Sequence, residues 1–424
     1  MKLVPDHISE MLKRLRGGAT DAELRQRFVN PSPLPKRLRA ARKATPQSVR
    51  AFWQRLRAET AATEADQAAL ADPATVADAA RYSANIENLI GTVKIPVGLA
   101  GPLRINGAHA RGDFLIPLAT TEAALVASYA RGAEVATLAG GVLAALASDG
   151  VLRTPGFKFE TMLHAGLFCE WVVAYADELR AVAETTTRHG KLVSIEPVID
   201  SDIVFLLCRY TTGDAAGQNM VTIATDALCR RIVEACPVTP LHWFVEANFS
   251  GDKKASHLGL LRGRGRKVTA SVTLPTALVE QRLHCTVEQM LDYARMAYLG
   301  ALMTGQIGAQ GHYANGLAAF YLATGQDAAC VAESAVGFSR MEARAGGLMI
   351  SATLPNILVG SVGGGTGLPS QSAGLNILGL KGAGKAAALA EVAASLCLVG
   401  EISIIAALAA GHFVRAHASL ARGR

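Results

Sequence analysis

The sequence is poor in aromatic and charged residues and has no long uninterrupted apolar run. Aromatic side chains make up 5% and charged ones 18% of its 424 residues, whereas 50% are hydrophobic. This balance excludes an intrinsically disordered chain. The longest apolar stretches, such as residues 402–410, are shorter than the roughly 20 residues of a membrane-spanning helix. We therefore expect a large core in two or three domains and no membrane partner.

Signals for secretion, disulfides and metal are also missing. The N-terminus lacks the basic-then-apolar layout of a signal peptide. The seven cysteines are scattered, odd in number and never spaced as CxxC, which favours reduced thiols in a cytoplasmic protein. His412 and His417 are five residues apart, whereas two zinc ligands on one helix face are four apart. No metal is expected.

Two common nucleotide-binding loops are absent or incomplete. No GxGxxG fingerprint occurs, so a doubly wound Rossmann domain is not predicted. Residues 379–386 satisfy GxxxxGK, but Ala386 stands where a P-loop carries the Ser or Thr that holds magnesium. A P-loop ATPase is therefore rejected.

Positive charge is concentrated at the N-terminus. The formal charge is +7, but residues 1–60 hold fourteen Lys and Arg against five Asp and Glu, so the remaining residues are slightly acidic. Such a segment suits nucleic acid or an anionic membrane surface, or it is a solvated helical arm that packs on a neighbouring subunit. We favour the arm and expect no nucleic-acid partner, because no nucleic-acid motif accompanies the charge.

Glycine and proline residues, together with changes in composition, divide the chain into segments. Residues 1–60 are predicted to be helical pieces broken at Gly17-Gly18 and at the proline-rich residues 31–35. Residues 61–80 are Ala-rich and also predicted helical. Residues 155–245 are predicted to form a separate α/β unit, with helices at 161–188 and 217–235 and strands at 192–196 and 203–207. Arg262, Arg264, Arg266 and Lys267 are expected in a solvated basic turn, followed by a helical region to about residue 303.

Residues 247–254, Ala-Asn-Phe-Ser-Gly-Asp-Lys-Lys, carry the clearest chemical signal. They follow a strand-like apolar run at 241–245. An Asp beside two lysines on a Gly-containing loop holds a cation in place, and a lysine against a carbonyl stabilises negative charge that develops on its oxygen. The alternative is a solvated surface turn, since lysine is normally exposed.

Two acids and one arginine are further candidates. Glu122 follows two threonines and is expected in the first turns of a helix, where it either favours the helix dipole or acts as a general acid whose pKa apolar neighbours raise. Asp327 is either a helix cap or a buried partner for a lysine. Arg153, expected in a turn at 149–155, suits a carboxylate or phosphate.

Two small-residue segments are suited to a ligand. Residues 212–220 combine a turn with a helix N-terminus, which is a ready anion site. Residues 359–367 form a glycine loop after a strand, and glycine permits close backbone approach to a ligand.

These segments occur in a specific order: ENLIG with IPVGLAGPL, TTEAALVAS, DGVLR, TGDAAGQNM, GDKKAS, GHYANGLAAFYLATGQDAA, SVGGGTG and GHFVRAH. From about residue 80 to its end, the chain resembles the catalytic portion of 3-hydroxy-3-methylglutaryl-coenzyme A (HMG-CoA) reductases. The resemblance implies a mixed α/β fold with a large catalytic domain at 81–154 and 246–424 and an inserted ferredoxin-like cofactor domain at 155–245, which follow the helical basic segment predicted at 1–80. It also implies homodimers, or tetramers built from dimers, with active sites at the interface.

The resemblance implies the four-electron reduction of a thioester to an alcohol, giving mevalonate and free coenzyme A. NADPH is the expected cofactor, with NADH as the alternative. By motif position, Lys253 matches the lysine that stabilises the oxyanion, Glu122 the acid that protonates the aldehyde oxygen, and Asp327 the buried acid that tunes both. His417 matches the histidine that protonates the departing thiolate, a role that suits its pKa near neutrality.

The same carry-over supplies the binding residues. Those implied for the acyl group and coenzyme A are Arg153, Asn248, Asp252, Lys254, Asn315, Glu87 and Asn88. Those implied for the nicotinamide cofactor are Asp214, Gly217, Asn219, Met220, Gly363, Gly364 and Gly365.

Some positions depart from the pattern of the animal relatives. Glu134 stands in place of a basic residue, Arg295-Met296 in place of an Asn-Lys pair, and Glu246 in place of a serine. A reductase of a different acyl-CoA is therefore one alternative, and a non-catalytic binding protein that uses the basic arm is another. The chain ends seven residues after His417, which favours the animal and archaeal class and with it NADPH.

Overall fold

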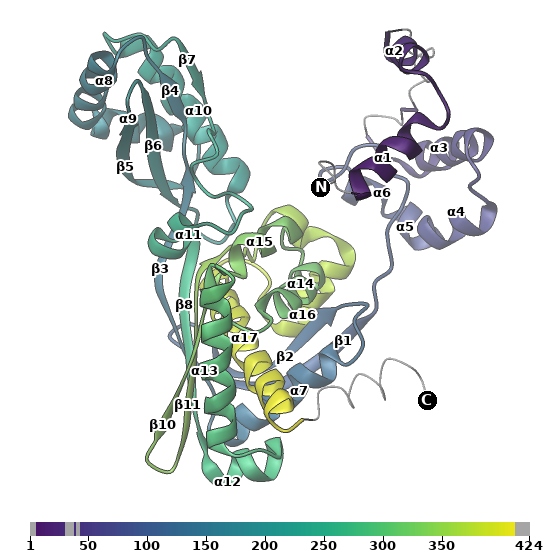
Figure 1. The fold of residues 1–424 in the computed structure, drawn as a ribbon, viewed down its shortest axis with the longest axis vertical. Coiled ribbons are helices and arrows are strands. Elements are labelled where there is room, and N and C mark those ends of the chain that lie inside the picture. The colour runs from purple at the N-terminus through teal and green to yellow at the C-terminus, as the bar shows by residue number, and fades with distance from the viewer. Residues whose placement is uncertain (1–5, 30–37, 40–42, 412–424) are drawn as a thin grey trace. The chain divides into compact units, whose positions relative to one another are not determined.

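The chain forms two compact units, Met1–Val93 and Lys94–Arg424. The computed structural model describes residues 6–29, 38–39 and 43–411. The predicted linker at 31–35 and the candidate His417 lie outside these residues. Because the placement of one unit against the other is not defined, each is described by itself (Figure 1).

The first unit is helical, as predicted. Its helices are α1 (Asp6–Arg16), α2 (Asp21–Val29), α3 (Pro46–Glu59), α4 (Glu64–Leu70), α5 (Pro73–Ala77) and α6 (Ala79–Tyr82). The break between α1 and α2 falls at Gly17-Gly18, where both residues have positive φ. Thr45 and Thr63 begin α3 and α4 with capping boxes. The buried Trp53 donates a 2.6 Å hydrogen bond to the Ile90 carbonyl and so ties α3 to the end of the unit.

The second unit is built on a nine-stranded sheet and a separate hairpin. The hairpin is β1 (Val97–Asn106) with β2 (Arg111–Ala119). The sheet has the order β7-β4-β6-β3-β8-β11-β10-β9, with β5 paired to β6. Its strands are β3 (Leu143–Arg153), β4 (Gly156–Lys158), β5 (Lys191–Asp200), β6 (Ile203–Thr211), β7 (His242–Phe244), β8 (Gly265–Pro275), β9 (Gly308–Ala309), β10 (Gly337–Arg344) and β11 (Gly347–Ile357).

Helices surround this sheet. They are α7 (Leu125–Leu138), α8 (Met162–Ala174), α9 (Ala176–Thr185), α10 (Gln218–Ala235), α11 (His257–Arg262), α12 (Thr276–Leu278), the π-helix η1 (Val279–Leu283), α13 (Val287–Met303), α14 (Tyr313–Thr324), the 3₁₀ helix η2 (Ala328–Cys330), α15 (Val331–Ser334), the 3₁₀ helix η3 (Gly364–Gly367), α16 (Pro369–Leu378) and α17 (Ala386–Ala409).

Strand β3 joins the two parts of this sheet. Residues 143–150 pair with β8, whereas the last three, Val151 to Arg153, pair with β6. The helices and strands predicted within 155–245 are present, with the helix at 161–188 divided into α8 and α9. In Figure 1 these elements form a layered group connected to the rest through β3.

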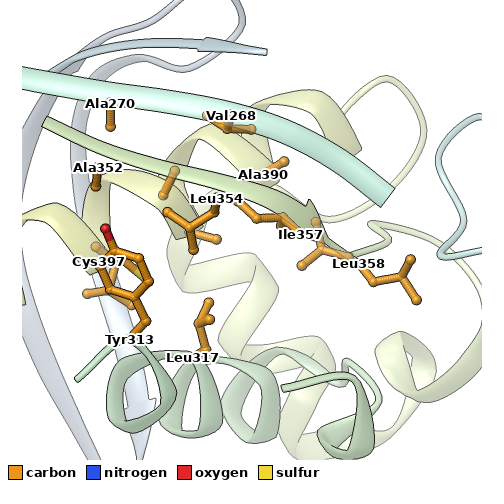
Figure 2. Close-up of a cluster of buried hydrophobic side chains, with 14 of the residues drawn as sticks. Val268, Ala270, Tyr313, Leu317, Ala352, Leu354, Ile357, Leu358, Ala390 and Cys397 are labelled. Atoms are coloured by element: carbon orange, nitrogen blue, oxygen red, sulfur yellow. The ribbon is translucent and has the colours of Figure 1, made fainter. Parts of the chain in front are cut away.

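The core lies between the central strands and two helices. α17 packs against β8 and β11, and α14 packs against α17. Figure 2 shows Val268 from β8 and Leu354 from β11 facing the same cluster as Leu317 from α14 and Cys397 from α17. Apolar burial of this extent is the main stabilising contribution to a fold.

The expectation that apolar stretches are too short to span a bilayer is wrong for one element. Among the described residues, the 24-residue α17 is the one helix that is long and apolar enough to do so, and 83% of its most apolar window is buried inside the fold. Its apolar character on all sides reflects its central position, because a helix that is hydrophobic all round is buried.

Three further predictions fail in the centre of the sheet. The segment that follows the basic turn is predicted to be helical to about residue 303, but residues 265–275 are strand β8, in which burial alternates along the chain. Arg264 and Arg266, expected in a solvated turn, are 1% and 3% exposed. Arg153 lies at the end of strand β3 rather than in a turn, because its backbone completes the ladder with β6.

The buried carboxylate of Glu391 on α17 generates a stability prediction. Its Oε2 accepts hydrogen bonds from the backbone N–H groups of His109 (2.8 Å) and Ala110 (2.7 Å), and its Oε1 accepts one from Leu146 (3.1 Å). Glu391→Ala leaves three N–H groups without this acceptor, so we expect a loss of about 3 kcal/mol or more in the free energy of unfolding. Denaturant unfolding followed by circular dichroism measures this loss.

The matched control for Glu391→Ala is Glu170→Ala, which replaces an exposed glutamate in the middle of α8. A surface substitution of this kind changes stability by about 0.5 kcal/mol or less. Equal effects of the two substitutions would show that Glu391 does not hold the hairpin to the sheet.

Candidate active site

Lys253 lies in a tight turn between β7 and α11, and its backbone is unusual. Its φ is 58°, and that of Asn248 is 63°, in the left-handed region that non-glycine residues seldom adopt. The Gly251 Cα approaches Ser256 so closely that an added Cβ would lie 2.6 Å from the Ser256 Oγ. Backbone of this kind persists where surrounding contacts impose it, and such positions cluster at functional sites.

Asp327 is the partner of Lys253. The Lys253 Nζ lies 2.8 Å from the Asp327 Oδ2, and the Asp327 Oδ1 accepts a hydrogen bond from the Ala329 N–H. Of the two alternatives that the sequence offers, the helix cap is confirmed, because Asp327 caps η2; the second is correct in the kind of partner, a lysine. Asp327 is not buried within this chain, however, since 43% of its side chain is exposed.

The pair shifts the titration of both groups. The hydrogen bond from Lys253 to Asp327 raises the pKa of the lysine above its ordinary value. Partial burial would raise the pKa of Asp327, but the hydrogen bonds from Lys253 and Ala329 outweigh it, and the pKa of Asp327 is lowered. The lysine is thus held in its cationic form.

Behind Lys253, the Asp252 carboxylate lies between two buried arginines. Its Oδ2 is 3.2 Å from the Arg153 guanidinium and its Oδ1 is 2.9 Å from that of Arg264. Arg264 in turn pairs with Glu333 at 2.6 Å, and both side chains are 1% exposed. Burial raises the pKa of Glu333, although the charge of Arg264 opposes the rise. Sequence reasoning missed this pair, because its members are 69 positions apart in the chain. The period-2 alternation after Gly265 was a signal only for strand β8, which follows Arg264.

Two more side chains complete this network. Glu246 binds the Arg153 guanidinium at 3.0 Å and accepts a hydrogen bond from the Asn248 N–H. The amide oxygen of Gln218, at the start of α10, accepts hydrogen bonds from both Arg153 and Arg264. We call the set Arg153, Gln218, Glu246, Asp252, Arg264 and Glu333 the charge network.

The glycine loop reaches the same site through Gln326. The Gln326 side chain exchanges two hydrogen bonds with the backbone of Gly360. A Cβ on Gly365 would lie 2.7 Å from the Gly325 carbonyl oxygen, so these two backbones touch. At Gly363 and Gly364, both with positive φ, an added Cβ would meet no atom within 4 Å. This part of the loop therefore faces open space.

The turn before α10 lies against this loop. The Asp214 carbonyl accepts a hydrogen bond from the Ser361 N–H, and its carboxylate accepts bonds from the N–H groups of Gly384 and Ala386. Partial burial would raise the pKa of Asp214, but these N–H groups outweigh it, and its pKa is lowered. The residues that resemble a P-loop thus bind a carboxylate of the chain itself.

Other predicted cofactor residues lie near this turn. Gly217 begins α10 with φ 80°, and a Cβ there would lie 2.2 Å from the Thr212 side chain, so glycine is required. Asn219 is exposed at the start of the helix. The Met220 sulfur accepts a hydrogen bond from Thr187, which attaches this end of α10 to the segment that follows α9.

Glu122 is not part of this cluster. It precedes α7, which begins at Leu125, and is not in the first turns of the helix as expected; its N–H instead binds the Thr120 hydroxyl. Both Glu122 oxygens accept from the Asn315 Nδ2, at 3.0 and 3.1 Å. Within the described chain, no hydrogen bond or ion pair joins Glu122 to Lys253.

Glu122 and Asp327 lie near different ends of helix α14. Asn315 lies in its first turn, whereas Asp327 follows its C-terminal cap, Gly325. At 1.5 Å per residue, the nine residues from Asn315 to Thr324 place the two ends about 14 Å apart. One chain thus presents Glu122 and the Lys253–Asp327 pair at different ends of one helix.

The remaining candidates are dispersed. Glu87 and Asn88 belong to the first unit, and His417 is outside the described residues. Lys254 is exposed and donates to the Asp252 carbonyl. Arg295 pairs with Glu288 and Asp292 on the surface of α13.

The structure also shows where Glu134 and Met296 lie, two positions that depart from the pattern of the animal relatives. Glu134 on α7 pairs with Arg282 at 3.2 Å, and Met296 is 68% exposed on α13. In the part of the chain that the structure describes, no group of three or more His, Cys, Asp or Glu residues is arranged to hold a metal ion. All seven cysteines are free.

Comparisons with known proteins agree on one family. The family model for hydroxymethylglutaryl-coenzyme A reductase matches residues 51–422. The 3-hydroxy-3-methylglutaryl-coenzyme A reductase of Methanothermobacter thermautotrophicus is 43% identical over 342 residues, 80% of this chain and 85% of that protein. The Aeropyrum pernix reductase is 44% identical over 348 residues, 81% of this chain and 83% of that protein.

A solved structure shares the fold. The class II 3-hydroxy-3-methylglutaryl-CoA reductase from Streptococcus pneumoniae, bound to NADPH in open conformations, has a TM-score of 0.63 and 20% identity, covering 77% of this chain and 88% of that one. Because the family model spans most of the sequence and relatives at 43% and 44% identity cover four fifths of it, this chain belongs to the hydroxymethylglutaryl-coenzyme A reductase family.

Proposed function

We propose that this protein reduces HMG-CoA to mevalonate and free coenzyme A with two hydrides from NADPH, the reaction of the mevalonate pathway. The observation that carries the proposal is the Lys253–Asp327 pair, 2.8 Å apart beside a glycine loop, in a chain of this family. A lysine that is kept cationic is suited to a carbonyl oxygen on which negative charge develops.

Lys253 performs the electrostatic part of the chemistry. Its ammonium group binds the thioester oxygen and stabilises the charge that forms there in each reduction step. Asp327 orients the ammonium group and keeps its proton, since the same hydrogen bond raises the pKa of the lysine. The charge network holds the side chain of Asp252, the residue before Lys253, through ion pairs with Arg153 and Arg264.

Two further residues supply protons in this proposal. Glu122, oriented by the Asn315 amide, protonates the oxygen of the aldehyde that the first reduction produces. His417 protonates the coenzyme A thiolate as it leaves, since a histidine pKa near neutrality suits a thiolate acceptor. Asn248 and Lys254 bind the acyl portion, and Glu87 and Asn88 line the coenzyme A side.

The residues around the glycine loop fit a nicotinamide cofactor. The loop presents open space at Gly363 and Gly364, and the buried Ser361 Oγ beside it has no hydrogen-bond partner among the described residues. The N-terminus of α10 carries no side-chain cap, which leaves N–H groups for an anion. NADPH supplies the hydrides when bound; Asp214 orders the turn, and Asn219 and Met220 flank it.

The separation of Glu122 from Lys253 supports an active site that two subunits share. We propose a homodimer, or a tetramer built from dimers, in which Glu122 of one chain meets Lys253 and Asp327 of its partner. The domain boundaries at 80, 154 and 245 belong to the same proposal. A cytoplasmic location fits seven free thiols, six of them buried.

Replacing Lys253 tests the proposed function. Wild-type protein with HMG-CoA is expected to oxidise two NADPH per thioester, and Lys253→Ala is expected to lower kcat by about a hundredfold or more, as for the loss of an oxyanion-stabilising group. Absorbance at the nicotinamide band measures both values. Lys158→Ala, which removes a surface lysine paired with Asp202, should leave kcat unchanged. Full activity of Lys253→Ala would mean that the site is elsewhere.

Asp327→Asn tests the pKa argument. Without the carboxylate, the pKa of Lys253 falls towards its ordinary value, so the ammonium group loses its proton at lower pH. We expect the alkaline limb of the pH profile of kcat/KM to move to lower pH. Asp202→Asn, which breaks the surface pair with Lys158, is the control with an unchanged profile. An alkaline limb at the same pH in both variants would contradict the role of Asp327.

Co-expression of two inactive variants tests the shared site. If Glu122 and Lys253 act from different subunits, a Glu122→Gln chain paired with a Lys253→Ala chain rebuilds one intact site per mixed dimer. Random pairing then restores about a quarter of the wild-type activity. Sites contained within one chain would give no restoration, because every site would carry one substitution.

A further inference from the structure

Glu246 is paired with Arg153, a buried arginine beside the turn that carries Lys253. The Arg153 guanidinium donates from one nitrogen to both Glu246 and Asp252, at 3.0 and 3.2 Å. The Glu246 side chain is 23% exposed and that of Arg153 only 7%, so the carboxylate is the more accessible member of the pair. The Arg153 Nε is buried and has no hydrogen-bond partner among the described residues, so Glu246, Asp252 and Gln218 satisfy only part of this guanidinium.

The other cations of the site are either paired with carboxylates or exposed to solvent. Arg264 is enclosed by Glu333, Asp252 and Gln218. Lys253 is paired with Asp327. Lys254 is exposed at the surface, where solvent weakens its attraction for an anion. Arg153 is the more exposed of the two buried arginines, at 7% against 1% for Arg264. Of its two carboxylate partners, Asp252 also pairs with Arg264, whereas Glu246 pairs with no other cation among the described residues.

Glu246 also sets the balance of charge. The site contains four cations, Arg153, Lys253, Lys254 and Arg264, and four carboxylates, Glu246, Asp252, Asp327 and Glu333. Its formal charge is zero, and replacing Glu246 by a neutral residue would make it +1. One side chain thus decides whether this site attracts an additional anion.

The substrate of the proposed reaction carries such an anion. The acyl chain of HMG-CoA ends in a carboxylate a few bonds from the thioester carbon. With that carbon at Lys253, the carboxylate lies within reach of Arg153, because Asp252 is adjacent to Lys253 and contacts Arg153. There it meets Glu246, and two like charges at short range repel each other.

We infer that Glu246 determines acyl specificity in this reductase: by pairing with Arg153 it disfavours an acyl carboxylate and so admits acyl thioesters whose far end is uncharged. The inference rests on the proposed reductase function. Glu246 acts through Arg153 and is a specificity-determining residue, without a role in the reduction itself. The substrate class it selects is a branched 3-hydroxyacyl thioester with a neutral terminus, alongside HMG-CoA.

The test compares two thioesters, HMG-CoA and 3-hydroxy-3-methylbutyryl-CoA, which lacks the carboxylate. For wild-type protein, we expect kcat/KM values that differ by less than about tenfold. Glu246→Gln and Glu246→Ser free Arg153 for the substrate, and a charge-assisted hydrogen bond then raises kcat/KM for HMG-CoA by about tenfold or more. The gain is expected in KM, and the values for the uncharged thioester stay nearly unchanged.

Glu196→Gln is the matched control, because it removes a glutamate from an exposed pair with Arg262 at 2.8 Å; it should alter neither thioester. Calorimetric binding of HMG-CoA to wild type and to Glu246→Gln provides a measurement independent of turnover, and thermal unfolding confirms that the variants fold. Tighter binding of HMG-CoA by Glu246→Gln supports the inference.

Several outcomes would overturn it. One is a hundredfold preference of wild type for HMG-CoA over the uncharged thioester. Another is a ratio between the two thioesters that both Glu246 variants leave unchanged, including an equal loss for both, which would identify Glu246 as structural. If wild type oxidises NADPH with neither thioester, the proposed function fails as well, and this result is distinct from an unchanged ratio in an active enzyme.

Discussion

The arrangement of the site depends on one carboxylate, that of Asp252, held between two arginines. A buried guanidinium is costly unless carboxylates satisfy it, so Arg153 and Arg264 fix Asp252 as firmly as Asp252 fixes them. The two arginines come from the end of β3 and from the residue before β8, which are neighbouring central strands. The left-handed turn that presents Lys253 is therefore anchored to the central strands of the sheet.

A second carboxylate organises the opposite side of the site. Asp214 links three loops, because its carbonyl binds Ser361 and its carboxylate binds the N–H groups at the start of α17. Since α17 is buried along most of its length, the turn before α10 and the glycine loop are held to a central element of the core. The Lys253 turn, held through Arg264 before β8, and the turn before α10, held to the start of α17, are thus both attached to packed elements of the core, although they lie far apart in sequence.

Local patterns in the sequence predicted much of this fold. The glycine pair between α1 and α2 and the α/β order of residues 155–245 were both predicted correctly, because each depends on neighbouring residues. The pairing of Lys253 with Asp327 was anticipated as one of two alternatives. The prediction failed for strand β8, because the basic residues at its start were interpreted as solvated charge. The alternation of apolar residues after Gly265 indicated a strand instead. The Arg264–Glu333 pair joins residues 69 positions apart, and no local pattern encodes such a contact.

Helix α14 lies between Glu122 and the Lys253–Asp327 pair, and the shared site proposed for them would have a genetic consequence. In a shared-site dimer, a chain with a defect only at Lys253 leaves one working site when paired with a normal chain. A chain defective at both Glu122 and Lys253 spoils both sites of that dimer, since each site draws on it once. Such an allele would act dominantly over a normal copy, and its severity would follow the ratio of the two gene products.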